Sequence, residues 1–168
     1  LPISIAVQVG VALAALLYIY RVTDTTSVTR VTTQYIEESR PHTLQDKDVP
    51  PYVDILRIHG PFLFGTSDKL ADATHDLSSL APIVVLRLRN MTAIDASGLH
   101  ALETLSDRLR ASGRTLVLCG ARHQPAAFLD RAEFREHVGA ENIQPHVQAA
   151  IDRARRIHAE QSAQNMPA

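Results

Sequence analysis

Two kinds of hydrophobic pattern divide the chain. The first twenty residues form an apolar run without a charged side chain, and Arg21 ends it. From Tyr52 onward, short apolar runs alternate with longer segments in which apolar positions recur every three or four residues. Short continuous runs are typical of buried strands, and the longer period is typical of helices that pack on one side. The pattern predicts an apolar N-terminal helix followed by an α/β domain.

The apolar runs predict strands at 53–58, 83–88 and 115–119. The sequence His59-Gly60-Pro61 predicts a turn, so that 53–64 forms an antiparallel-looking hairpin. A strand–helix–strand link has to cross over the sheet, so the strands at 83–88 and 115–119 should pair in parallel. We therefore expect a mixed sheet of about four to six strands.

Four periodic segments predict helices that cover this sheet. The first follows the caps Thr66 and Ser67 and ends before Pro82; the others lie at 98–111, 124–131 and 145–159. Gly113 is a natural C-terminal stop for the helix at 98–111, and Pro145 fits the first turn of the helix at 145–159. Together with the strands, these helices make one domain of the α/β class.

The chain divides into four parts on this basis. Residues 1–20 are long enough as a helix to span about 30 Å, the thickness of a bilayer's hydrocarbon core, and we expect a transmembrane helix. A signal peptide fits less well, because the run is long and no basic leader precedes it, and a buried core helix is the other alternative. Residues 21–51 form a polar linker with a short strand at 28–33. Residues 52–160 form the folded domain, and 161–168 a disordered tail.

Composition excludes several function classes. The 168 residues carry 17 Lys and Arg against 18 Asp and Glu, so no basic excess is present to neutralise a nucleic acid. The single Cys119 excludes an intramolecular disulfide, and as the end of a buried strand we expect it to be inert. The eight histidines are scattered, so we expect no metal site, and no Gly-x-x-x-x-Gly-Lys-Ser/Thr loop occurs, so we expect no cofactor.

One tight corner carries the candidate chemistry. The segment Asp95-Ala96-Ser97-Gly98-Leu99 joins an apolar strand to a helix, and a helix N-terminus favours negative charge. The corner predicts a phosphorylation site or an anion contact at Ser97, Asp95 and Gly98. The alternative, which we favour, makes Ser97 a plain N-cap of the following helix. A serine–histidine nucleophile with His100 is a weak hypothesis, because the flanking sequence is not a Gly-x-Ser-x-Gly elbow.

The corner resembles the signature of STAS domains, the fold of bacterial anti-sigma factor antagonists and of the cytoplasmic tails of SulP-type anion transporters. Two further segments are similar to the transporter version. Residues 57–65 (RIHGPFLFG) look like the first hairpin of the transporter version. The segment Cys119-Gly120-Ala121-Arg122, together with residues 132–134 and 139–143, looks like the C-terminal part of that domain. The similarity extends from Leu1 to about His158, because an apolar span directly upstream is what the last membrane helix of such a transporter would look like.

The resemblance implies a fold and a function. The fold is a STAS-type mixed β-sheet packed with α-helices and preceded by one transmembrane helix. The chain would be the C-terminal fragment of a bacterial SulP-type secondary transporter of sulfate, bicarbonate or a dicarboxylate-like anion, in the inner membrane with the STAS domain cytoplasmic. It would regulate transport and would not be an enzyme. The alternative is a membrane-tethered phospho-switch like the anti-sigma factor antagonists.

The resemblance also implies partners. They are the transmembrane part of the same transporter, with the transported anion in that part, and a regulatory protein or a second copy of the chain; nucleic acid is not among them. We expect the working surface to be the start of the 98–111 helix together with a loop at 89–97. Its candidate contact residues are Arg89, Asn90, Met91, Thr92 and His100.

Overall fold

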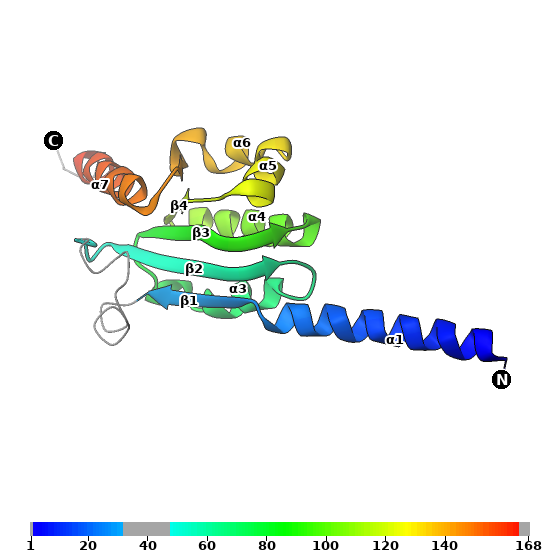
Figure 1. The fold of residues 1–168 in the computed structure, drawn as a ribbon. Coiled ribbons are helices and arrows are strands. Elements are labelled where there is room, and N and C mark those ends of the chain that lie inside the picture. The colour runs from blue at the N-terminus through cyan, green and yellow to red at the C-terminus, as the bar shows by residue number, and fades with distance from the viewer. Residues whose placement is uncertain (1, 32–47, 165–168) are drawn as a thin grey trace.

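The computed structural model describes residues 2–31 and 48–164, and it contains one five-stranded sheet (Figure 1). The strands follow one another in chain order: β1 (Ser27–Val31), β2 (Val53–Phe62), β3 (Ile83–Ile94), β4 (Thr115–Cys119) and β5 (Ile143–Gln144). β1 is antiparallel to β2, and every other neighbouring pair is parallel. The predicted mixed sheet, and the parallel pairing of the strands at 83 and 115, are confirmed.

Helices cover both faces of this sheet. The helices are α1 (Ile3–Asp24), α3 (Ser67–Ala73), α4 (Ala96–Ala111), α5 (His123–Arg131), α6 (Phe134–Val138) and α7 (Val147–Gln164), with short 3₁₀ turns at Leu77–Ser79 and Ala140–Asn142. One face buries Leu56, Leu86 and Leu118 under helices α3 to α6. The other buries Ile55, Val85 and Val117, and α7 is the one described helix that covers it. The alternate residues of β2, β3 and β4 thus feed two cores, which is why these strands are apolar along their length.

The predicted hairpin at 53–64 is wrong. Residues 53–62 form the single strand β2, which passes through Gly60 and Pro61 without reversing. Its antiparallel partner is β1, where Val28 pairs with Ile58 and Arg30 with Leu56. The expected strand at 28–33 is therefore present over 27–31, and residues 32–33 lie outside the described part. Arg30 adds a two-point ion pair to Asp54, from Nε to Oδ1 at 3.0 Å and from Nη2 to Oδ2 at 2.7 Å.

β3 is twice as long as the predicted strand at 83–88. Arg57 pairs with Arg87 and His59 with Asn90, so β3 holds one more residue than β2 between these pairs. A second extra residue lies between the pairs Gly60–Met91 and Phe62–Ile94. These bulges place Leu88, Met91 and Ile94 in the same core at a spacing of three residues. The period of two stops at Leu88, which is why the sequence pattern predicts an end there.

Helix α1 projects away from the domain (Figure 1). Its described side chains are exposed from Pro2 to Arg21, including Ile3 at 83% and Leu17 at 68%. The structure does not support the expected transmembrane helix: within residues 2–31 and 48–164, no helix has the combined length and apolarity of a membrane span.

The remaining helix boundaries differ modestly from those predicted. α4 begins at Ala96 instead of residue 98, and α7 begins at Val147, after Pro145. α7 continues to Gln164, into the segment expected to be a tail, whose last four residues lie outside the described part. Most of the predicted linker, residues 32–47, lies outside it as well.

Candidate functional site

The start of α4 is organised by the carboxylate of Asp95. Its Oδ1 accepts the N–H of Gly98 at 2.9 Å, which makes Asp95 the N-cap of the helix. Its Oδ2 accepts the N–H of Phe64 at 2.9 Å, across the β2–α3 loop. The preferred interpretation of Ser97 as the N-cap is therefore wrong, because α4 begins one residue earlier than Ser97. One carboxylate joins two segments that are about thirty residues apart in sequence.

Gly98 is required by close packing. A Cβ atom at Gly98 would lie 2.5 Å from the carbonyl oxygen of Phe62 and 2.9 Å from the Ile94 side chain. Any larger residue would push the first turn of α4 away from the ends of β2 and β3. The N–H of Gly98 is also already bonded to Asp95. Both observations give Gly98 a structural role in the corner.

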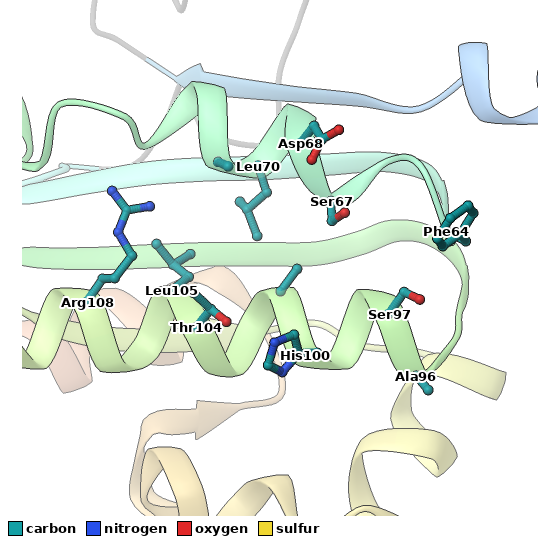
Figure 2. A pocket seen from close by; sticks show the side chains of 12 residues that line it. Phe64, Ser67, Asp68, Leu70, Ala96, Ser97, His100, Thr104, Leu105 and Arg108 are labelled. Atoms are coloured by element: carbon teal, nitrogen blue, oxygen red, sulfur yellow. The ribbon is translucent and has the colours of Figure 1, made fainter.

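Ser97 lies at one end of a cavity between α3 and α4, which we call the docking groove (Figure 2). The groove has a volume of about 530 Å³ and is lined by Phe64, Leu70, Ser97, His100, Leu105, Arg108 and neighbouring residues. Ser97 and Phe64 stand together at the end nearest the β2–α3 loop, and Arg108 lies at the far end (Figure 2). The Ser97 hydroxyl makes no hydrogen bond to any residue that the structure describes. It therefore remains open to a ligand or a modifying enzyme.

Between Ser97 and Arg108 the groove is lined by both apolar and polar side chains, the polar ones being Ser67, Asp68, His100 and Thr104. Leu70 and Leu105 are almost fully buried between the two helices, whereas Phe64 is 77% exposed at the mouth. Arg108 donates to the backbone oxygen of Thr74 at 3.3 Å. His100 lies beside Glu103, with 3.7 Å between Nδ1 and Oε2. A cavity that combines buried leucines with hydrogen-bonding side chains suits a peptide segment with an apolar side chain.

The structure divides the predicted partner surface between two places. The expected loop at 89–97 is wrong, since residues 89–94 continue β3. His100 lines the docking groove, but Met91 is 3% exposed and belongs to the core. Thr92 is exposed, Asn90 is half-buried, and Arg89 lies at a second cavity near the start of α7. Only His100 of these five residues therefore shares a cavity with Ser97.

Two features of this corner were not predicted from the sequence. Gln124 of α5 binds the end of β3 at both of its amide atoms: Oε1 accepts the N–H of Ile94 at 2.9 Å, and Nε2 donates to its carbonyl at 2.8 Å. Lys69 Nζ donates to the backbone oxygen of Thr26 at 2.7 Å, where α1 meets β1. In the sequence, Gln124 and Lys69 are each a single polar residue near the start of a helix. That pattern is too common to distinguish these two residues from others.

The junction between α1 and the sheet is held at the same edge as Phe64. The Thr26 hydroxyl donates to the backbone oxygen of Pro61, and Thr26 is 3% exposed. Gly60 has a φ of +90°, and a Cβ there would lie 3.0 Å from the Thr25 oxygen. α1 leaves the domain beside the β2–α3 loop (Figure 1). The root of α1 and the mouth of the docking groove therefore lie at one corner of the molecule.

Two further observations concern the single cysteine and the residues that could bind a metal. Burial raises the pKa of the Cys119 thiol to about 12, although nearby Arg87 acts in the opposite direction. The thiol is therefore protonated at neutral pH, as expected of an inert buried cysteine. Within the described residues, no group of three or more His, Cys, Asp or Glu side chains is arranged to hold a metal ion.

Comparisons with known proteins agree with the fold. The STAS domain family matches residues 45–150. Among curated proteins, the Bacillus subtilis protein YvdB, named as a sulfate transporter, is 24% identical over 143 residues. That alignment covers 84% of this chain and 26% of YvdB. The chain thus spans about a quarter of the length of this relative.

Solved structures give the same result. A sulfate transporter family protein from Wolinella succinogenes is 30% identical, with a TM-score of 0.65 over 72% of this chain and 99% of that one. The murine anion transporter Slc26a9 in its inward-facing state is 20% identical, with a TM-score of 0.67 over 93% of this chain and 26% of that one. The uncovered 7% is about 12 residues of 168, fewer than the 22 of α1, so the similarity in fold includes part of α1.

The same fold occurs outside transporters. A Thermotoga maritima protein described as an anti-sigma factor antagonist is 16% identical, with a TM-score of 0.55 over 64% of this chain and 92% of that one. The mixed sheet, the Asp95–Gly98 corner and the extended family match lead to one conclusion. This chain belongs to the STAS domain family and is related to the STAS domains of SulP and SLC26 sulfate transporters.

Proposed function

We propose that this chain is the cytosolic regulatory and interaction module of a bacterial SulP-type secondary anion transporter, and that it is not itself an enzyme. The observation that carries the proposal is the docking groove, a cavity of mixed apolar and polar lining whose mouth lies at the corner from which α1 leaves. A module that controls a membrane protein needs such a contact surface close to its attachment point. Sulfate, bicarbonate or a dicarboxylate-like anion would pass through the membrane part of the protein, outside this chain.

The groove would hold an apolar segment from the membrane part of the same transporter. Its volume of about 530 Å³ falls in the range that accommodates several side chains. Phe64, at 77% exposure, is a large apolar side chain at the mouth with little to cover it. Burying such a ring contributes about 1.5 to 3 kcal/mol, which is enough to bias a contact between two parts of one protein.

Ser97 would act as the switch for this contact. A phosphate on its hydroxyl adds about 1.5 to 2 negative charges at the mouth of the docking groove. The nearby carboxylate of Asp95 already occupies the positive end of α4, so the added charge would be repelled there. Phosphorylation is therefore expected to release the segment from the groove.

Helix α1 would lie in an apolar environment that the parent protein and its membrane supply. Support comes from its side chains, which are apolar and exposed all around the helix. The proposal concerns burial of this surface against lipid or neighbouring helices, and α1 need not cross the bilayer alone. Under this proposal the parent protein lies in the inner membrane and the domain lies in the cytoplasm. A second copy of the chain would be a further binding partner.

The test is anion uptake by the full-length parent protein in proteoliposomes. We expect Phe64→Ser and Ser97→Asp to change the uptake rate of sulfate several-fold, and Ser97→Ala to leave it unchanged. The matched control is Ser162→Asp, which adds the same charge at an exposed position near the end of α7. Equal uptake by the wild type, Phe64→Ser and Ser97→Asp would refute a regulatory role for the groove.

The second candidate function is a membrane-tethered phospho-switch whose partner is a regulator protein. The free Ser97 hydroxyl at the groove mouth favours it, as does the fold similarity to the Thermotoga maritima protein. Under this function, Ser97→Asp would change the affinity for a regulator without changing any anion flux. Pull-down of a regulator kinase by the unphosphorylated chain, beside unchanged uptake, would favour it over transport regulation.

A further inference from the structure

A second cavity lies where β3 and β4 end, against the start of α7, and we call it the arginine cleft. Its volume is about 150 Å³, and it is lined by Arg87, Arg89 and Arg122 together with Cys119, His146 and Val147. It lies on the α7 face of the sheet, whereas the docking groove lies on the opposite face. No carboxylate is among its lining residues.

Arg87 is the unusual member of this cleft. Its exposed fraction is 6%, yet it makes no hydrogen bond or ion pair with any residue in the described part of the chain. Burial is the main cause that lowers the pKa of its guanidinium; Cys119 acts in the opposite direction, and Arg89, Arg57 and Arg122 each lower the pKa by a smaller amount. Buried charges in proteins are normally paired, because removing a charge from water is costly.

The sheet register explains why the positive charge is concentrated here. Arg57, Arg87 and Cys119 are direct cross-strand neighbours on β2, β3 and β4, so their side chains share one face. Arg89 follows two residues later on β3 and lines the same cavity. The Cys119 thiol cannot balance the charges of Arg87 and Arg89, since its raised pKa keeps it neutral.

The start of α7 adds to the positive potential. α7 has 18 residues and begins at Val147, which lines the cleft. The N-terminus of a helix of this length carries the positive end of the helix dipole. His146 caps it, with Nδ1 accepting the N–H of Ala149 at 3.1 Å. A guanidinium cluster and a helix N-terminus thus point into one small cavity.

We propose that the arginine cleft binds a tetrahedral oxyanion, either a free sulfate or phosphate ion or the phosphoryl group of a larger ligand. A guanidinium offers paired N–H donors that match two oxygens of such an anion. The cavity of about 150 Å³ admits one group of that size and excludes a nucleotide base beside it. A doubly charged anion would compensate Arg87 and its neighbours, which no carboxylate lining the cleft does. The proposal does not depend on the docking groove or on transport, so either can fail without the other.

The test is calorimetric titration of the whole 168-residue chain in mild detergent with sodium sulfate, sodium phosphate and phenyl phosphate, each against sodium chloride at equal ionic strength. We expect saturable binding at one site and a higher melting temperature with the bound anion. Arg89→Gln and Arg122→Gln should each weaken binding about tenfold or more, since each removes a charged donor. Arg156→Gln is the control, because it removes the same charge at an exposed position farther along α7.

Arg87→Met provides a second readout that a merely structural arginine would not give. It should abolish binding and, without anion, raise the melting temperature, because an uncompensated buried charge is replaced by an apolar chain. Binding of sulfate and phosphate supports a free oxyanion as the ligand, and binding of phenyl phosphate alone supports a phosphoryl group on a larger molecule. Absence of saturable binding, or equal weakening by Arg156→Gln, would overturn the proposal.

Discussion

At the scale of single residues, the Asp95 carboxylate and the Ser97 hydroxyl have separate roles. Asp95 bonds the N–H groups of Gly98 and Phe64, whereas Ser97 bonds nothing in the described part of the chain. We expect Asp95→Ala to lower the free energy of unfolding by about 1 to 2 kcal/mol, and Ser97→Ala to change it by less than about 0.5 kcal/mol. Urea denaturation of both variants measures the difference. A larger loss for Ser97→Ala than for Asp95→Ala would contradict the assignment of the cap.

Gly98 gives a second prediction, in which two effects oppose each other. Alanine is favoured over glycine inside a helix by about 1 kcal/mol. At Gly98, however, the new Cβ would lie 2.5 Å from the backbone oxygen of Phe62, which cannot move aside easily. We expect Gly98→Ala to destabilise the domain by about 2 kcal/mol or more, because overpacking outweighs the helix propensity.

The matched control for Gly98→Ala is Gly10→Ala in α1, where a Cβ would meet no atom within 4 Å. That variant should leave the unfolding of the domain unchanged. Thermal denaturation followed by circular dichroism distinguishes the two. If Gly98→Ala melted at the temperature of the unmodified chain, close packing at the corner would be disproved.

At the scale of elements, the sequence predicts the parallel strands and the helices well but misses the connections between them. The strands at 83 and 115 are apolar on both faces, and the helical stripe of Leu102, Leu105 and Leu109 is regular. β2 was divided in error, because Gly60 and Pro61 together are typical of a turn. Here they lie in the part of β2 beyond its last pair with β1, Ser27–His59, and Pro61 falls at a bulge in the pairing with β3, so the missing N–H of proline is tolerated.

The candidate site was only partly predictable for a related reason. Asp95, Ser97 and Gly98 stand out because they follow one another in sequence. The docking groove needs Phe64 and Leu70 from the segment before β3, and the arginine cleft needs Arg87 beside Arg122. Such groupings depend on strand register and on bulges, which are set by contacts between distant segments and not by local pattern.

The end of β3 offers a prediction at this scale. Gln124 binds both the N–H and the carbonyl of Ile94, which is the last residue of the strand. We expect Gln124→Ala to increase hydrogen exchange at the Ile94 amide at least tenfold while the amides of β4 remain protected, since the loss is local. Gln164→Ala, at the exposed end of α7, is the control. Unchanged exchange at Ile94 would show that the amide pair does not hold the strand end.

At the scale of the whole molecule, α1 and the domain behave as separate parts. The described side chains of α1 from Pro2 to Arg21 are exposed, so they add little to the core. Deleting residues 1–24 should leave the melting temperature of the domain within about 2 °C, because the buried residues of both cores lie outside α1. Differential scanning calorimetry of the two chains measures this.

The same deletion should abolish binding to lipid vesicles in flotation experiments. The whole chain should float with neutral and anionic vesicles alike and at high salt, because burial of apolar surface does not depend on charge. Leu13→Lys, in the middle of α1, should weaken flotation without changing the domain. Binding that persisted after the deletion would place the lipid contact on the domain instead.

The corner at which α1 leaves the sheet has a mechanical consequence. Thr26 is held by Pro61 and by Lys69, and Lys69 belongs to α3, one wall of the docking groove. A tilt of α1 about this anchor would therefore act as a lever on α3. If a tilt of α1 changes the binding free energy of a ligand in the groove, then binding of that ligand must change the free energy of the tilt by the same amount. Lys69→Met would remove the hydrogen bond through which α3 contacts the root of α1.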